Sequence, residues 1–109
     1  MKKRLNLTQF TYEAKIIAST VQTQGKAMIT HDINEIGTCA TTNDVITLMP
    51  CVAGLRVTVA NNGAEVLQVF PASGDNFVGS AANASTTINA GYAKQFISYN
   101  GSSWIVFSN

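Results

Sequence analysis

The segment Leu55-Arg-Val-Thr-Val-Ala-Asn-Asn-Gly-Ala-Glu-Val-Leu-Gln-Val-Phe-Pro71 carries the strongest structural signal in this chain. On both sides of Asn61-Asn62-Gly63, β-branched and aromatic residues alternate with small or polar ones, a pattern typical of strands that are buried on one face. Asn and Gly tolerate the left-handed backbone that tight turns require. The segment therefore predicts a β-hairpin over residues 55–70.

Shorter segments of the same character surround this hairpin. Residues 44–49, 85–89 and 94–99 have the pattern of strands, and residues 104–107 form a nearly continuous apolar strand after a turn at 100–103. Short strands separated by turn residues predict an all-β fold. We expect a single compact β-sandwich or barrel of about seven or eight short antiparallel strands, with a jelly roll as one candidate.

A chain of 109 residues fits one domain with a modest core. Alternation of apolar residues such as Phe10, Tyr12 and Ile16 favours an extended N-terminal arm and first strand over residues 1–26. Residues 27–109 are then expected to form the body of the sandwich or barrel.

Only 12% of the residues are charged, compared with roughly a quarter in ordinary soluble domains. Such a surface is common where other protein subunits cover it, so we expect an obligate assembly. Lys2, Lys3 and Arg4 supply three of the seven basic residues. This basic tip is too small for a nucleic-acid footprint, and we expect no nucleic-acid partner.

Neither a secretory signal nor a transmembrane helix is indicated, because no apolar run is long enough. We therefore expect synthesis in a cytoplasm, without membrane association, where Cys39 and Cys51 stay reduced and pack as small apolar side chains. Two cysteines and one histidine do not make a zinc site.

Catalytic motifs are not found. His31-Asp32 is not accompanied by a nucleophile motif, and the chain has no glycine-rich phosphate loop, so we expect no enzyme activity, cofactor or small-molecule substrate. Asp75 follows Ser73-Gly74, where a carboxylate is either a calcium ligand or an acceptor of backbone N–H bonds in a turn. The turn role is favoured, and no metal is expected.

A longer pattern runs through these segments. It consists of Asp44-Val-Ile-Thr-Leu-Met-Pro50, Gly54, Val57-Thr-Val59, Asn61-Asn-Gly63, Leu67-Gln-Val-Phe-Pro-Ala-Ser-Gly-Asp75, Gly79, Asn83, Ala90-Gly91, Phe96, Gly101 and Trp104. The pattern resembles one in structural proteins of tailed bacteriophage virions, including capsid decoration, head-fibre and tail-fibre proteins. Phe77 and Cys51 depart from it, which implies local repacking.

The resemblance implies a virion component on the capsid exterior, assembled in the host cytoplasm. Because a fibre would need a shaft and this chain holds little besides one domain, we expect a capsid decoration or cement protein, a homotrimer that binds the major capsid protein. A dimer remains open on physical grounds. The residues expected to contact the capsid are Lys2, Lys3, Arg4, Phe10 and Tyr12.

The C-terminal strand is expected to pack in the core or at a subunit interface through Trp104, Val106 and Phe107. An alternative function stays open, namely a head-fibre or tail-fibre tip that binds a host receptor or surface carbohydrate. In that case the loops 76–84 and 99–104 would face solvent.

Overall fold

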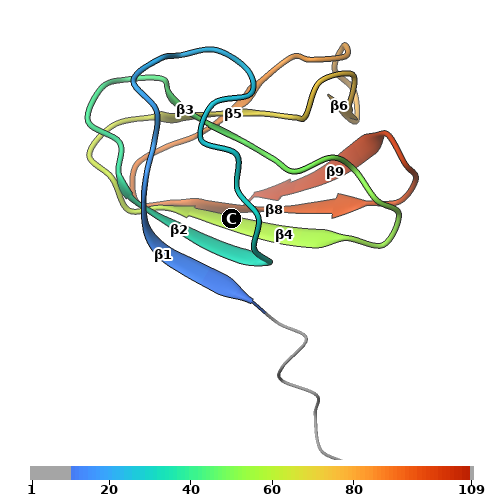
Figure 1. The fold of residues 1–109 in the computed structure, drawn as a ribbon, viewed down its shortest axis with the longest axis horizontal. Coiled ribbons are helices and arrows are strands. Elements are labelled where there is room, and N and C mark those ends of the chain that lie inside the picture. The colour runs from blue at the N-terminus through green and yellow to red at the C-terminus, as the bar shows by residue number, and fades with distance from the viewer. Residues whose placement is uncertain (1–10, 109) are drawn as a thin grey trace, which may run out of the picture.

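The computed structural model describes residues 11–108, which form nine strands and no helix. The large sheet has six strands in the order β1-β2-β4-β8-β9-β6, and the small sheet has three in the order β3-β5-β7. Figure 1 shows the sheets as two layers. The all-β prediction is confirmed. The strands are β1 (Tyr12–Ile17), β2 (Ile33–Thr38), β3 (Asp44–Thr47), β4 (Arg56–Asn61), β5 (Leu67–Phe70), β6 (Asn76–Phe77), β7 (Thr86–Ile88), β8 (Ala93–Ser98) and β9 (Ser103–Ser108).

From β1 to β5 the chain winds between the layers, and each coil stacks on the one before it. β1, β2 and β4 pair in parallel in the large sheet, as do β3 and β5 in the small sheet. β7, β8 and β9 then add antiparallel pairs. The strands are therefore mixed and the stacking is solenoid-like. The prediction of an antiparallel sandwich or barrel, including the jelly roll, was wrong because alternation shows which face is buried but not the direction of the partner strand.

The hairpin predicted over residues 55–70 does not form. β4 lies between β2 and β8, whereas β5 lies in the other sheet between β3 and β7. The left-handed backbone expected at this turn is not found either, since none of Asn61, Asn62 and Gly63 has a positive φ. The Asn61 side-chain oxygen does accept the Gly63 N–H at 3.0 Å. The Asn61 side-chain amide, however, donates to the carbonyls of Glu65 and Ile88, both at 2.9 Å. These bonds direct the chain across to the small sheet.

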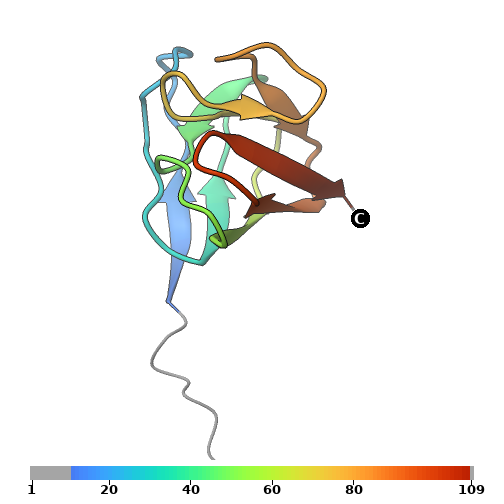
Figure 2. The same cartoon turned by 90° about the vertical axis from the view of Figure 1, so that its right-hand side faces the viewer.

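The turn predicted over residues 100–103 is confirmed, and it joins the strands of a hairpin. β8 and β9 pair antiparallel, with Phe96 opposite Val106. The turn is held by Asn100, whose side-chain oxygen accepts the N–H groups of Ser102 and Ser103 at 2.9 and 2.8 Å. Figure 2 views the molecule from the end that carries this turn. The strands expected within 44–49 and 85–89 also form, as β3 and β7.

The core lies between the two sheets and closes around aromatic side chains from the large one. The ring centroids of Phe77 and Phe96 are 5.5 Å apart, and Trp104 is fully buried. Burial of such side chains contributes about 1.5–3 kcal/mol each. The apolar residues buried beside them include Ala18, Ile29, Ile36, Ile46, Leu48, Val57, Val59, Leu67, Val69 and Ile88.

β1 lies at one edge of the large sheet, within the range expected for an arm and first strand. Its pairing with β2 is irregular, with register shifts around Ile16 and a positive φ of 61° at Lys15. Gly37 permits this close approach, since a Cβ there would lie 3.0 Å from the Lys15 Cα. Irregularities of this kind discourage pairing with a further strand.

Candidate functional site

The predicted capsid-contact residues are only partly within the structure. Lys2, Lys3, Arg4 and Phe10 lie outside the described residues. Tyr12 begins β1 opposite Ile33 of β2, and 65% of it is exposed. Tyr12 therefore lies at the point where the chain enters the large sheet.

The C-terminal strand divides its side chains between two faces. Trp104 is buried in the core, and Val106 packs against that core from a partly buried position. Phe107 points the other way, lies opposite Gln95 and is 50% exposed. The strand thus presents one face to the core and one face to the exterior.

We call the side of the large sheet that points away from the small sheet the outer face. A row of five paired residues crosses it from β1 to β9, in the order Tyr12, Ile33, Thr58, Gln95 and Phe107. Tyr12, Ile33 and Phe107 are exposed large hydrophobic residues. Ile97 and Ile105 form a second pair beside the row. The sequence predicted a strand within residues 94–99 but did not predict this face.

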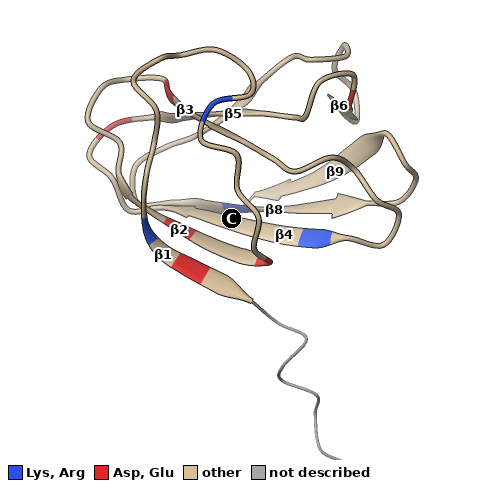
Figure 3. Cartoon of the chain, in the orientation of Figure 1, with Lys and Arg blue, Asp and Glu red and all other residues tan. Residues whose placement is uncertain are grey.

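Charged residues of the large sheet gather toward β1 and β2. Figure 3 shows most of β4, β8 and β9 without charge, apart from Arg56 at the start of β4 and Lys94 in β8. β1 and β2 carry Glu13, Lys15 and Glu35. Interfaces between subunits are depleted in charge at their centre and enriched in aromatic residues. The exposed Tyr12, Ile33 and Phe107 give the outer face the apolar and aromatic part of this composition.

Two shallow hollows adjoin at the centre of the outer face. One, of about 390 Å³, has the apolar Ile33 and Leu55 and the charged Asp32 and Arg56 in its wall. The other, of about 320 Å³, lies against Phe107. Thr58 and Gln95 line both. The outer face is therefore a continuous, gently hollowed surface rather than a ridge.

Glu35 ties three segments together at one side of the outer face. Its carboxylate accepts the Lys15 N–H at 2.7 Å and the Asn62 side-chain N–H at 2.9 Å. The bond from Asn62, followed by that from the Lys15 backbone, holds the pKa of Glu35 below its ordinary value. Burial opposes this shift slightly, and the positive charge of Lys15 adds to it.

The depressed pKa of Glu35 predicts an acid-sensitive contribution to stability. A group with a lowered folded-state pKa stabilises the fold above its unfolded pKa, and this contribution disappears as the pH falls through the folded pKa. Thermal unfolding should therefore show a Tm that decreases as the pH falls below about 4.5. Glu35→Gln and Asn62→Ala should each make that decrease shallower. An unchanged slope in both variants would contradict the role of this carboxylate.

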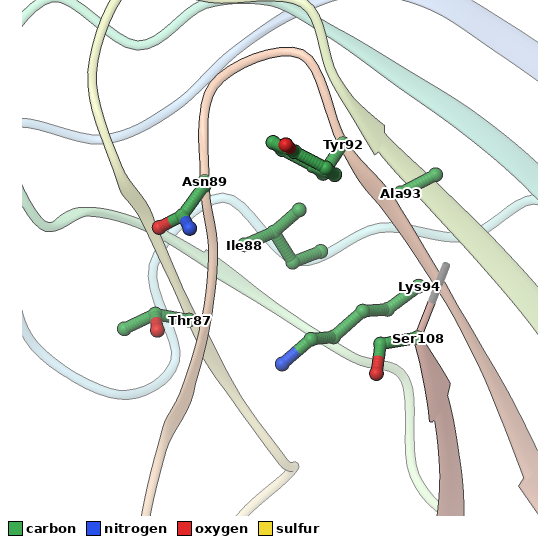
Figure 4. A pocket seen from close by; sticks show the side chains of 7 residues that line it. All are labelled: Thr87, Ile88, Asn89, Tyr92, Ala93, Lys94 and Ser108. Atoms are coloured by element: carbon green, nitrogen blue, oxygen red, sulfur yellow. The ribbon is translucent and has the colours of Figure 1, made fainter.

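A third hollow, of about 400 Å³, lies between the β7–β8 turn and the end of β9. We call it the Tyr92–Lys94 hollow. Figure 4 shows Ile88 between Tyr92 and Lys94, with Ser108 beside Lys94. Ile88 is buried, whereas Tyr92 is 54% exposed. The sequence did not predict this hollow. Its lining consists of Thr87, Ile88, Asn89, Tyr92, Ala93, Lys94 and Ser108.

Asp75 has the turn role that the sequence favoured. Its carboxylate accepts the backbone N–H of Cys51 at 2.9 Å. Cys39 and Cys51 are both buried free thiols, and burial is the main cause that raises the pKa of each. Raised pKa values and burial lower the reactivity of a thiol, in agreement with a packing role.

His31 and Asp32 contact different side chains and backbone groups. The His31 ring contacts the Glu13 carboxylate at 3.3 Å, while the Asp32 carboxylate accepts the Thr11 N–H at 3.0 Å. Within residues 11–108, no group of three or more His, Cys, Asp or Glu side chains is placed to hold a metal ion.

No family model, curated protein or solved structure matches this chain. In the described part of the chain, no helix is long and apolar enough to span a membrane. Two surfaces of the structure are candidates for a function, namely the outer face and the Tyr92–Lys94 hollow.

Proposed function

We propose that this protein is a non-enzymatic virion structural protein, a capsid decoration or cement protein of a tailed bacteriophage. It binds the shell of the major capsid protein as a homotrimer and stabilises that shell from outside. The observation that carries the proposal is the row of exposed apolar side chains on the outer face of the large sheet. The association of the protein with virions rests on the sequence pattern that resembles phage structural proteins, which covers roughly residues 28–108.

The two sides of the outer face suit two contacts. Phe107 and Ile105 lie at the β9 side, where they would pack against a neighbouring copy in the trimer. Tyr12 and Ile33 lie at the β1 side, next to the N-terminal arm, where they would meet the shell. Burial of these exposed apolar side chains is a favourable term in both associations.

Single charges on the outer face should separate these contacts. Phe107→Glu should weaken trimer formation at least about tenfold, because the interface would bury an unpaired charge. Ile33→Glu should weaken binding to shells by a similar factor. Light scattering on eluting protein measures the trimer, and co-sedimentation with shells that lack this protein measures attachment.

Val21→Glu is the matched control for both variants. Val21 is 54% exposed, close to the value for Phe107, and lies in the segment between β1 and β2. This variant should assemble and sediment as the unmodified protein does. Failure of the unmodified chain to sediment with shells would contradict the proposal, as would normal attachment of Ile33→Glu.

One observation favours the alternative of a fibre tip that binds a host receptor or surface carbohydrate. The loops around 76–84 and 99–104 meet at one end of the molecule, where Asn76 N–H bonds the Ser102 carbonyl at 3.0 Å. The Ser103 hydroxyl also donates to the Asn76 side-chain oxygen at 2.7 Å. Tyr99 and Val78 belong to these two loops and are both exposed. Under this alternative, Tyr99→Ala would lower binding to host cells and leave shell binding unchanged.

A further inference from the structure

We propose that the Tyr92–Lys94 hollow binds a sugar acid, a hydroxylated carboxylate of the hexuronate type, with Lys94 as its cationic partner. This inference does not depend on where the protein sits in a virion. It rests on three features of the hollow: a cation with no acidic partner among residues 11–108, a lining matched to one negative charge, and an aromatic wall above an apolar floor.

The positive charge of Lys94 has no acidic partner within residues 11–108. Its ammonium donates to the Thr86 hydroxyl at 3.2 Å, and no acidic side chain lines the hollow. An ammonium has three donors, so donors remain for a bound anion. The chain's six acidic side chains are bonded elsewhere, namely Glu13 to His31, Asp32 to Thr11, Glu35 to Lys15 and Asn62, Asp44 to Thr41, Glu65 to Thr42 and Asp75 to Cys51.

The charge of the hollow favours a carboxylate over a phosphate. Lys94 is the one cationic side chain among the lining residues that the structure describes. Phosphate sites commonly use helix N-termini or clusters of backbone N–H groups in addition to cations, and residues 11–108 contain no helix. A single ammonium matches a single negative charge, and charge-assisted bonds to carboxylates are among the stronger hydrogen bonds in proteins.

The shape and the remaining lining suit a sugar ring. The volume of about 400 Å³ lies in the range of small-molecule pockets, about 300–1,000 Å³. Ile88 provides an apolar floor and the Tyr92 ring one wall (Figure 4), against which the C–H face of a sugar would pack. The hydroxyl of Ser108 and the amide of Asn89 can exchange hydrogen bonds with sugar hydroxyls.

Amide NMR spectra of the full chain during titration with sodium glucuronate test this proposal. Saturable shifts should appear over residues 87–94 and at Ser108, with a Kd of about 1 mM. Lys94→Gln should weaken binding at least about tenfold, whereas Lys94→Arg should retain it within a few-fold. Tyr92→Ala should weaken binding about fivefold.

Three variants serve as controls. Lys26→Gln removes an exposed lysine elsewhere, and Tyr99→Ala removes a tyrosine that is 57% exposed, compared with 54% for Tyr92. Lys26→Gln should bind glucuronate as the unmodified chain does, and so should Val52→Ala, which removes an apolar side chain that is 61% exposed outside the hollow. Tyr99→Ala shows whether loss of any exposed tyrosine lowers the affinity, and weakening equal to that of Tyr92→Ala would contradict the role of Tyr92. The dispersion of each spectrum shows directly whether a variant is folded, so loss of binding is not confused with loss of structure.

Competing ligands decide the chemical class. Glucose, sodium acetate and inorganic phosphate should each bind at least about fivefold more weakly than glucuronate, because each lacks the carboxylate, the ring or the matched charge. Equal binding of any of them, or unchanged binding by Lys94→Gln, would overturn the proposal. A glucuronate-containing oligosaccharide that binds more tightly than the free sugar acid would identify a glycan as the source, and equal binding would identify the free acid.

Discussion

Gly63→Ala should destabilise the fold by about 3 kcal/mol, toward the upper end of the usual effect of overpacking. A Cβ at this position would lie 2.4 Å from the backbone nitrogen of Cys39 and 2.6 Å from its Cβ. Both are main-chain or near-main-chain atoms, so a side-chain rotation cannot relieve the clash. The whole passage between β4 and β5 would have to move away from the end of β2. Urea unfolding at a fixed protein concentration measures this loss.

Gly101→Ala is the control for this substitution. Gly101 lies in the β8–β9 turn, where an added Cβ would meet no atom within 4 Å. Its free energy of unfolding should stay within about 0.5 kcal/mol of that of the unmodified chain. If Gly63→Ala were as stable as Gly101→Ala, the close passage of the Asn61-Asn62-Gly63 turn against Cys39 would be wrong.

Trp104→Ala should destabilise the fold by about 4 kcal/mol, which is typical when a large aromatic core residue is truncated. Trp104 is among the largest fully buried side chains, and it lies opposite Phe77 of β6 in the pairing of β6 with β9. Its removal would leave a cavity between these strands and the small sheet. Thermal and urea unfolding, monitored by circular dichroism, give the change in stability.

Trp104→Phe separates packing from hydrogen bonding. The indole N–H of Trp104 has no hydrogen-bond partner among residues 11–108, so its removal should carry no hydrogen-bond penalty. We expect a loss of about 1–2 kcal/mol from the reduced volume alone. Tyr99→Ala, at an exposed position, should change stability by less than about 0.5 kcal/mol. A Trp104→Ala loss as small as that of Tyr99→Ala would contradict the placement of Trp104 in the core.

The parts of the fold that sequence predicted are those with local causes. The β8–β9 hairpin follows from turn residues whose bonding partners lie within three positions, as at Asn100. Strand β3 ends shortly before Pro50, which cannot donate to a ladder. Asp75 likewise closes a local turn, because its N–H donates to the Ala72 carbonyl at 2.9 Å. In each case a few neighbouring residues determine the result.

The parts that sequence did not predict depend on distant partners. Residues 55–70 alternate in the same way whether they form a hairpin or two strands in different sheets. The choice is made by β2 and β8, which occupy both edges of β4, and by the bond from Asn61 to Ile88, 27 residues away. Parallel coils leave no local signature comparable to a two-residue turn.

The surface residues, too, were predicted from the sequence only where a local pattern indicated them. Phe107 could be singled out because it belongs to a nearly continuous apolar run, which is typical of a strand that is covered on both faces. Ile33 comes from a distant coil, and only the register from β1 to β9 shows that it shares a row with Phe107. The Tyr92–Lys94 hollow joins β7, β8 and β9, so no short motif could indicate it.

High-resolution electron microscopy of purified virions that carry this chain tests the central claim most directly. The decoration proposal predicts copies spread symmetrically over the head, with the outer face buried, Phe107 against a neighbouring copy and Ile33 against the shell. Density confined to the tail or to a projecting tip, or an outer face open to solvent on the head, would contradict it.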